Sequence, residues 1–301
     1  MEPAAPVVVI GDALIDELRD GTTVTELVGG AALNVAVGLV RLGVPATLIA
    51  MVGDDEPGDH IRAYLRDYGV GLLASPAPLG SSRAVSTRVG GEPAYTFNEA
   101  ARSRAVTYGA AEREAMDTAP FVVVSCFPFD DAAQVTALAD AVGERPLVID
   151  PNPRAGMLTD RAAFVAGFES LVPRCALVKV GTDDASLLYG IPVDNLRERL
   201  AAATTVLATA GAAGAVLEVD GHTISAPVAA LPGSVVDTMG AGDAVLASIV
   251  ASLVQGGRMD AAAWAAALDR AMQIAAATVR FEGALLRIPG ADALDLDRLG
   301  T

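Results

Sequence analysis

Short apolar runs alternate with longer helical patterns along most of this chain. The first run, residues 6–11, is ended by Gly11, and such runs are typical of parallel strands that are buried on both faces. Strands that alternate with helices predict an α/β fold with a parallel sheet covered by helices on both sides. We expect strands near residues 6–11, 46–52, 121–125, 147–149, 177–180 and 205–208, and helices near residues 34–42, 58–68, 131–142, 185–189, 244–255 and 261–280.

Two stretches, residues 13–28 and 82–107, break this pattern because they are more polar and alternate as β-strands do. Within the second, segment 88–95 places a Gly-Gly turn between strand-like flanks, as in a hairpin. We interpret both stretches as one small sheet that forms a lid over the carboxyl ends of the core strands, where open α/β sheets bind ligands. The alternative is two ordinary surface loops. Because the chain shows no linker and no internal repeat, residues 1–301 are expected to form a single domain.

The charge balance narrows the range of partners. The chain has 37 acidic and 21 basic residues, a net charge of −16, and shows no basic patch, so nucleic-acid binding is not expected. Phosphate would have to be bound locally, by backbone dipoles, a few arginines and metal ions. No apolar run reaches the ~18 residues of a membrane span, and no basic-then-apolar leader opens the chain. We therefore expect a soluble cytoplasmic protein without a membrane partner.

The few lysine, cysteine and histidine residues exclude further classes of enzyme and of metal site. Lys179 is the only lysine, and it stands in neither a P-loop nor a protein-kinase motif, so a phosphotransferase would have to use another architecture. Cys126 and Cys175 are too few and too far apart for a disulfide framework or a zinc site, and His60 and His222 offer no metal cluster.

The segment 235–245 carries the strongest chemical signal. Gly240 and Gly242 allow a tight turn with accessible N–H groups, and the helix that follows directs its positive end at the same place, so an anion is expected there. Asp243 lies inside this anion site. A carboxylate beside a phosphate suits a general base that takes a proton from an attacking hydroxyl, whereas the alternative is a simple helix cap. The turn alone leaves the two interpretations nearly level.

Three other segments add polar groups at predicted strand ends. The segment 11–16, with Asp12 and Asp16, precedes the pair Gly29-Gly30 and Asn34, a set that suits a polyhydroxyl ligand. It is no Rossmann fingerprint, because no G-x-G-x-x-G follows the first strand. The other two segments are the loop 150–154, Asp-Pro-Asn-Pro-Arg, and the glycine turn 209–214.

The loop and the glycine turn each allow a functional and a plain interpretation. Arg154 could bind a phosphate or carboxylate with two hydrogen bonds, or be a surface arginine on a rigid turn. The turn 209–214 suits close approach of nucleotide phosphates, although glycine turns of this kind are common.

In their order and spacing, these segments resemble the ribokinase-like (pfkB-type) carbohydrate kinase family over essentially the whole chain. Asp237-Thr-Met-Gly-Ala-Gly-Asp243 is the most specific of them, and the segments 11–16 and 150–154 look most like the fructokinase branch. The resemblance implies a three-layer α/β/α fold with a mostly parallel central sheet and a small β lid. It also implies transfer of the γ-phosphoryl group of ATP to a sugar hydroxyl.

The resemblance assigns roles to individual residues. Asp243 matches the general base, and Gly240, Ala241 and Gly242 match the anion hole that stabilises the transferring phosphoryl group. Asp16, Gly30 and Asn34 match sugar-binding positions, and Asp12 and Arg154 are further substrate-binding candidates. Thr209, Gly211 and Gly214 match the nucleotide side, Ala275 to Gly283 falls where the adenine pocket usually closes, and Gly242 is a further nucleotide-binding candidate.

Metal binding is where this sequence departs from the family. Members often carry Asn-x-x-Glu, which organises Mg²⁺ through water, whereas this chain has Gly181-Thr-Asp-Asp184. Asp184 is therefore the candidate Mg²⁺ residue. Asp237 matches a position near a monovalent-cation site, and dependence on K⁺ varies across the family.

Fructose is the first substrate predicted from the resemblance of the 150–154 loop. Ribose, a keto-deoxy sugar acid and a nucleoside are the alternatives, and a non-catalytic sugar or nucleotide sensor on the same fold is a different class of function. The intact run Gly240-Ala-Gly-Asp243 favours the enzyme. The expected partners are a sugar and ATP, and a homodimer through the lid occurs in many members.

Overall fold

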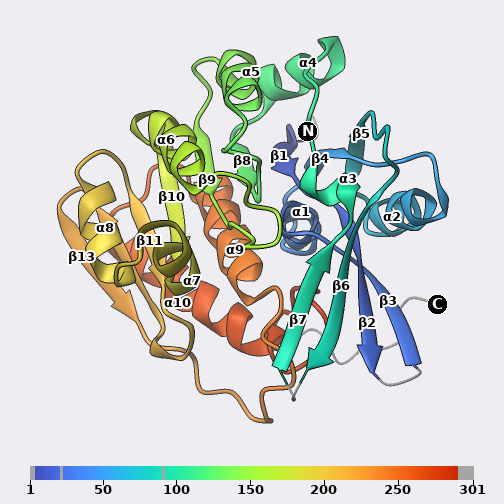
Figure 1. Ribbon diagram of the computed structural model, residues 1–301. Helices are drawn as coiled ribbons and strands as arrows, with labels where there is room; N and C mark the ends of the chain where they lie inside the picture. Colours follow the sequence, from blue (N-terminus) through green and yellow to red (C-terminus); the bar gives the residue numbers. More distant parts are fainter. Residues whose placement is uncertain (1–3, 21–22, 90–91, 291–301) are drawn as a thin grey trace.

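A nine-stranded sheet forms the centre of the structure, a computed structural model that describes residues 4–20, 23–89 and 92–290 (Figure 1). Its strands are ordered β13-β12-β11-β10-β9-β8-β1-β4-β5. Neighbours from β11 to β5 pair parallel, and β12 and β13 add an antiparallel hairpin at one edge. The strands are β1 (Val7–Gly11), β4 (Ala46–Met51), β5 (Gly71–Ser75), β8 (Val122–Ser125), β9 (Leu147–Asp150), β10 (Cys175–Gly181), β11 (Val206–Thr209), β12 (Ala215–Val219) and β13 (His222–Ala226).

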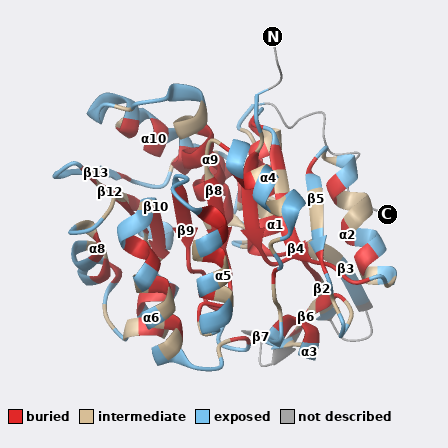
Figure 2. Ribbon diagram, turned by 90° about the horizontal axis from the view of Figure 1, so that it is seen from above, coloured by how far each residue is buried: buried red, intermediate tan, exposed pale blue. Residues whose placement is uncertain are grey.

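Helices cover both faces of this sheet and complete three layers, with the strands buried between them (Figure 2). One face packs against α1 (Ala31–Arg41), α2 (Glu56–Asp67), α9 (Ala241–Gly256) and α10 (Ala261–Thr278). The other face packs against α4 (Ala110–Thr118), α5 (Ala132–Val142), α6 (Arg161–Leu171) and α8 (Val193–Ala201). Shorter pieces are α3 (Glu99–Arg102), α7 (Thr182–Asp184), the π turn Ala185–Tyr189, and the 3₁₀ turns Val172–Arg174 and Gly211–Ala213.

Local sequence signals explain where several helices begin. The side chains of Asp55, Asp131, Asp160 and Asp260 accept hydrogen bonds from backbone N–H groups in the first turns of α2, α5, α6 and α10. These caps satisfy donors that the helix itself leaves unpaired. The helices α1 and α9 instead start from glycines, which offer no side-chain cap. In α1 the N–H of Ala32 donates to the Asp12 side chain, which lies outside the helix.

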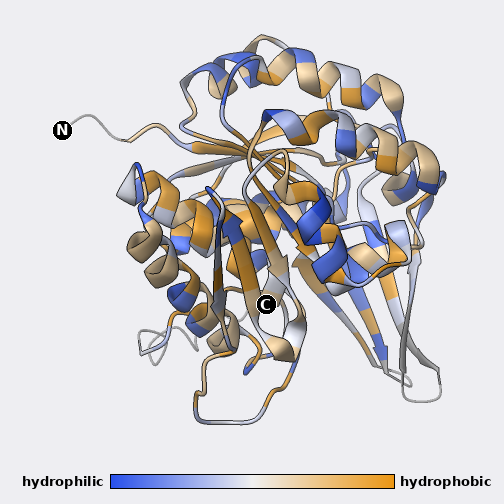
Figure 3. Ribbon diagram, turned by 90° about the vertical axis from the view of Figure 1, so that its left-hand side faces the viewer, coloured by the Kyte–Doolittle hydropathy of each residue, from blue (hydrophilic) through white to orange (hydrophobic). Residues whose placement is uncertain are grey.

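A second sheet of four strands stands apart from the core, in the order β3-β2-β6-β7 among the described residues (Figure 1). It consists of β2 (Leu14–Asp20), β3 (Thr23–Gly29), β6 (Ser82–Val89) and β7 (Glu92–Phe97). Polar and hydrophobic residues are mixed along these strands, whereas the central strand β1 is entirely apolar (Figure 3). The predicted small sheet is therefore present, although the Gly90-Gly91 turn lies outside the described residues.

The predicted lid segment 82–107 extends too far, because its last strand ends at Phe97. The Asn98 side chain accepts a hydrogen bond from Ala101 N–H and starts α3. The same side chain also accepts from Arg83 N–H and donates to the Ser81 carbonyl, which fixes α3 to the base of the small sheet.

The three-layer fold and the mostly parallel sheet confirm the predicted fold class. The predicted strands and helices are present with ends that differ by a few residues, and the predicted helix 185–189 is a π turn after α7. Within the described residues, no helix is both long and apolar enough to cross a membrane.

Candidate active site

The carboxyl ends of the core strands lie along one edge of the sheet. Gly11, Ser125 and Asp150 are in register at the ends of β1, β8 and β9, and Gly181 and Thr209 are in register at the ends of β10 and β11. The chain proceeds from β1 to β4 on one side, whereas β8 joins β1 on the other, so the strand order reverses between β1 and β8. Open α/β sheets bind ligands outside such a reversal. The site is therefore expected at this edge.

Asp12 follows β1 directly and is buried at the reversal point. Its Oδ1 accepts a hydrogen bond of 3.1 Å from the N–H of Ala32 in the first turn of α1. Burial raises the pKa of Asp12, and the Ala32 hydrogen bond and the charges of Arg104 and Arg154 act in the opposite direction. A predicted sugar-binding residue therefore lies in a buried polar cluster with both arginines nearby.

Asp16 lies on β2, where the small sheet meets the core. Gly29 on the paired strand leaves room for it, since a Cβ on Gly29 would be 2.2 Å from Asp16 Oδ2. Burial raises the pKa of Asp16 to about 7, with the charges of Asp12 and Asp243 acting in the same direction and Arg154 against it. The predicted sugar-binding carboxylate and the predicted base are thus electrostatically coupled.

Asn34 connects the two central helices. It lies on α1, and its Nδ2 donates a hydrogen bond of 2.9 Å to Oδ2 of Asp243 on α9. Gly30, which precedes α1, has φ +114°, and a Cβ there would be 2.7 Å from the Asp12 carbonyl oxygen. The glycine permits the close turn that brings Asn34 to Asp243. The structure therefore gives Asn34 a contact with the predicted base, which the sequence did not indicate.

Asp243 is buried in the first turn of α9 and does not act as the cap of that helix. The N-cap residue is Gly240, which makes no side-chain cap bond, and the Asp243 carboxylate accepts from Asn34. Burial raises the pKa of Asp243 to about 6, while the hydrogen bond from Asn34 and the charge of Lys179 lower it. A carboxylate poised near neutral pH at a helix amino terminus fits the general base better than a cap.

The turn that precedes Asp243 combines a positive φ with close backbone packing. Gly240 has φ +74°, and a Cβ there would be 2.6 Å from both Cα and the carbonyl oxygen of Ala284. Only glycine fits this combination of positive φ and close packing. Ala241 and Gly242 follow as the first residues of the 16-residue helix α9, so their N–H groups share the positive end of its dipole.

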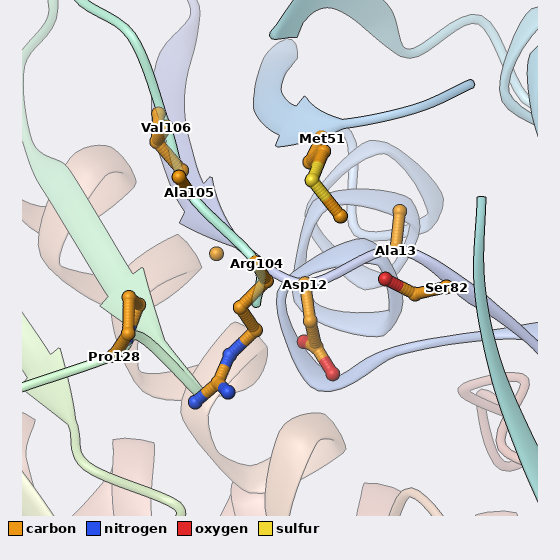
Figure 4. Close-up of a pocket in the computed structure, with 9 residues that line it drawn as sticks. Asp12, Ala13, Met51, Ser82, Arg104, Ala105, Val106 and Pro128 are labelled. Atoms are coloured by element: carbon orange, nitrogen blue, oxygen red, sulfur yellow. The ribbon is translucent and has the colours of Figure 1, made fainter. Parts of the chain in front are cut away.

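A small cavity of about 10 Å³ lies between the end of β1 and the segment 104–106 (Figure 4). The side chains of Asp12 and Arg104 line it and extend side by side. The Arg104 guanidinium donates to the carbonyl oxygens of Cys126 at 3.2 Å and Ala101 at 3.3 Å. Arg154, in the loop after β9, is exposed, and the carboxylates of Asp243 and Asp12 are among the groups that raise its pKa.

The predicted nucleotide-binding residues of the 209–214 turn lie further along the same edge. Thr209 ends β11, and its Oγ1 donates to the Val180 carbonyl oxygen at 3.5 Å. Gly211 has φ +53°, and a Cβ there would meet no atom of the described residues within 4 Å, whereas a Cβ on Gly214 would be 2.3 Å from the Ala226 carbonyl oxygen. Within this turn, Gly211 therefore has open space beside it, whereas Gly214 packs against β13.

Asp237 joins the loop before α9 to the loop after α10. Its Oδ1 accepts from Met239 N–H at 2.9 Å, and its Oδ2 accepts from Gly283 N–H at 3.0 Å. Ala275 lies half-buried on α10, so it belongs to the helix that precedes this loop. The bonds explain why an acid stands at position 237, since it crosslinks two loops, and the monovalent-cation role stays a prediction.

Of the residues that the structure describes, Asp184 is the candidate carboxylate for an Mg²⁺ ion that is bound through water. Oδ2 of the buried Asp184 accepts from Gly181 N–H at 2.6 Å, which orients the carboxylate at the end of β10. Among the described residues, no group of three or more His, Cys, Asp and Glu side chains is arranged to hold a metal. Mg²⁺ in phosphotransferases commonly uses one or two carboxylates, water and the substrate phosphates, so this donor set fits it.

Sequence reasoning missed the buried ion pair beneath the turn. Lys179 stands in no known lysine motif and was given no role from the sequence. Its Nζ lies 2.6 Å from Asp150 Oδ2, and both side chains are buried. A Cβ on Gly242 would be 3.1 Å from the same Nζ. A lysine at the end of an apolar strand was the available signal, because a charge there must find a buried partner.

The comparisons with known proteins agree with this geometry. The family model described as pfkB family carbohydrate kinase matches residues 5–289. The chain belongs to the pfkB carbohydrate kinase family. It is similar to fructokinase from Klebsiella pneumoniae, with 31% identity over 312 residues that cover 95% of this chain and 97% of that protein. It is also similar to fructokinase from Rhizobium leguminosarum bv. trifolii, with 30% identity over 259 residues that cover 81% and 78% of the two chains.

Among solved structures, this pfkB kinase is similar to aminoimidazole riboside kinase from Salmonella enterica in complex with aminoimidazole riboside and an ATP analogue. The TM-score is 0.75 at 26% identity, and the match covers 93% of this chain and 95% of that one. The predicted family and fold are thereby confirmed, and the sugar is left to be identified.

Proposed function

We propose that this pfkB kinase transfers the γ-phosphoryl group of ATP to a hydroxyl of fructose. The observation that carries the proposal is the buried Asp243, held by Asn34 at the amino end of α9 and preceded by an open glycine turn. Phosphoryl transfer needs mainly positioning and charge stabilisation, and this arrangement offers both.

Each part of the arrangement has a task in the proposed reaction. Asp243 accepts the proton of the attacking hydroxyl, for which its carboxylate must be ionised. The N–H groups of Ala241 and Gly242, with the α9 dipole, stabilise charge on the transferring phosphoryl oxygens. Mg²⁺, when bound with ATP near Asp184, would offset the charge of the nucleotide phosphates. The small sheet β3-β2-β6-β7 serves as a lid that excludes water, and the chain works as one kinase domain.

The polar groups around the sugar end favour a neutral polyol. Asp12 offers a buried carboxyl group and Asp16 a half-buried one, and both can accept hydrogen bonds from hydroxyls or donate to them. The charge of Arg104 is coupled to Asp12, and that of Arg154 to Asp12 and Asp243, so both arginines already have acidic partners. A keto-deoxy sugar acid would add a carboxylate to an acidic cleft, and it ranks below fructose. Fructose is also the substrate named for the two fructokinase relatives.

A nucleoside is the second candidate substrate. The Salmonella enterica relative binds aminoimidazole riboside, according to its description, and resembles this chain over most of both lengths. Ribose itself remains a third candidate within the same reaction.

The proposal is tested by measuring ADP release from ATP and Mg²⁺ with fructose, ribose, a keto-deoxy sugar acid and aminoimidazole riboside, with and without K⁺. We expect the highest kcat/KM with fructose. Highest activity with the riboside would replace the substrate and keep the kinase. Saturable sugar binding without ADP release from any of them would support a non-catalytic sensor and overturn the proposal.

We also propose that two copies associate through the lid sheet. Val24 on the edge strand β3 and Tyr95 on the edge strand β7 are 56% and 46% exposed, which is high for apolar side chains. Replacing both with Ser should convert a dimer to a monomer in sedimentation or light-scattering measurements. A wild-type chain that is monomeric at micromolar concentration contradicts this assignment.

A further inference from the structure

Three neighbouring strands place polar side chains in a row below the site. Ser125 and Asp150 are in register at the ends of β8 and β9, and Lys179 follows Val178, which is in register with Ile149. Side chains two residues apart point to the same face of a strand. Val123, Val148 and Leu177 pack into the core shared with α1 and α9, so the polar row lies on that face too. The row therefore lies beneath the amino ends of the two helices that meet at Asp243.

Fold stability does not explain this row. The Lys179 and Asp150 side chains are 6% and 0% exposed, and one bond of 2.6 Å joins them. Within the described residues, Asp150 Oδ1 and Ser125 Oγ are buried without a hydrogen-bond partner. A buried ion pair with unsatisfied atoms is a poor source of stability compared with apolar residues of the same volume. Such groups occur where function needs them.

The ammonium of Lys179 lies directly behind the predicted anion hole. A Cβ on Gly242 would be 3.1 Å from Nζ and 3.5 Å from Cε, so Nζ lies against the backbone that begins α9. Burial alone would lower the pKa of Lys179, but the charges of Asp150, Asp184 and Asp243 raise it above its ordinary value. The side chain is therefore a permanent cation at neutral pH.

Charges on several elements act on Asp243. Asp150 on β9 and Asp16 on β2 oppose its ionisation, whereas Lys179 on β10 and Arg154 in the loop after β9 favour it. Asn34 on α1 adds a neutral hydrogen bond. Arg154 is exposed, so solvent screens its effect, and Lys179 is the buried cation of the set. A phosphoryl group at the turn would add further negative charge to the same place.

We propose that Lys179, held in place by Asp150, is a positioning residue for phosphoryl transfer. Its ammonium favours the ionised form of Asp243 and adds a fixed positive charge behind the Ala241–Gly242 turn. The inference rests on the proposed kinase function. It assigns a role to the one lysine of the chain and to the Asp of the 150–154 loop.

The test separates this role from a purely structural ion pair. The double variant Asp150→Asn/Lys179→Gln removes both charges and keeps two polar side chains, so it should fold with a melting temperature close to that of the wild type. We expect kcat to fall roughly a hundredfold, the scale of one lost donor in an oxyanion site. The KM for ATP should change only a few-fold. The acidic limb of the kcat/KM profile should move slightly to higher pH, because the two lost charges act on Asp243 in opposite directions and the effect of Lys179 is the larger.

Turnover of the double variant within about threefold of the wild type, with an unchanged pH profile, would overturn the inference. If the double variant does not fold, Lys179→Arg and Lys179→Met are compared instead. The inference then requires that the Arg variant, which keeps the positive charge, turns over at least tenfold faster than the Met variant. Equal rates of those two would also overturn it. Wild-type ADP release is measured first, because its absence contradicts the kinase function, whereas an active wild type with an equally active double variant contradicts the Lys179 role alone.

Discussion

Two glycine turns lie on the same edge of the sheet and differ in what lies behind them. The turn 237–243 leads into the 16-residue helix α9, packs against Ala284 and holds the buried Asp243. The turn 209–214 contains a 3₁₀ turn of three residues, leads into β12 and has no charged side chain. Glycine content alone would rank the two turns equally. The first turn combines a helix dipole with buried charges, whereas the second offers backbone groups and the Thr209 hydroxyl.

The largest difference between the two turns is expected from alanine substitutions at their open glycines. Gly240→Ala places a Cβ 2.6 Å from the Ala284 backbone at φ +74°, so the anion hole must shift. We expect kcat to fall roughly a hundredfold or more. Gly211→Ala is the matched control, with φ +53° and no atom of the described residues within 4 Å of its Cβ. It should lose less than tenfold, and similar losses for both would break the comparison.

A stability measurement sharpens the role of the second turn. Gly214→Ala places a Cβ 2.3 Å from the Ala226 carbonyl oxygen at φ +90°, where β12 pairs with β13. The free energy of unfolding should fall by about 2 kcal/mol, roughly thirtyfold in the folding equilibrium. The kcat of the folded fraction should stay near the wild-type value. Chemical denaturation and active-site titration measure the two quantities, and a specific loss of kcat would show that this turn does more than pack.

The pH dependence of turnover should come from the first turn alone. Because the pKa of Asp243 is raised to about 6 by burial and the base acts when ionised, kcat/KM should be level above pH 7 and fall as pH drops through about 6. The decrease approaches tenfold for each pH unit below that value. Asp16, with a pKa raised to about 7, should affect the KM for the sugar more than kcat. A profile that is flat between pH 5 and 8 contradicts the assignment.

The smallest effect is expected at Thr209. Thr209→Val keeps the volume and the β-propensity and removes the Oγ1 bond to the Val180 carbonyl oxygen. The KM for ATP should rise a few-fold with kcat unchanged. Thr204 lies just before β11, at the end of the strand opposite Thr209. Thr204→Val removes a comparable bond from Oγ1 to the Cys175 carbonyl oxygen and should leave the KM for ATP unchanged.

The sequence predicted the parts of the fold that local patterns determine. The buried parallel strands and the α9 and α10 helices follow from apolar runs and their ends, and the small sheet follows from alternation. The edge strands β5, β12 and β13 and the helices α4, α6 and α8 were not predicted, because partly exposed elements carry weaker hydrophobic patterns.

The candidate site shows the same division. Asp243 and the Gly240–Gly242 turn are adjacent in sequence, so one motif predicts both. The bond from Asn34 to Asp243 joins residues 209 positions apart, and the Lys179–Asp150 pair joins residues 29 positions apart. These contacts depend on strand order and register, which no single motif determines. For that reason the only lysine was excluded as a kinase signal although it lies behind the anion hole.

The measurement that tests the account most directly is the turnover of Asp243→Asn with ATP, Mg²⁺ and the best sugar of the ADP-release screen. Asn is nearly isosteric and can still accept the hydrogen bond from Asn34, so folding and ATP affinity should be preserved. We expect kcat to fall by roughly a thousandfold, within the range that general-base catalysis contributes. A folded Asp243→Asn variant that binds ATP and turns over at nearly the wild-type rate would contradict the assignment of Asp243 as the base.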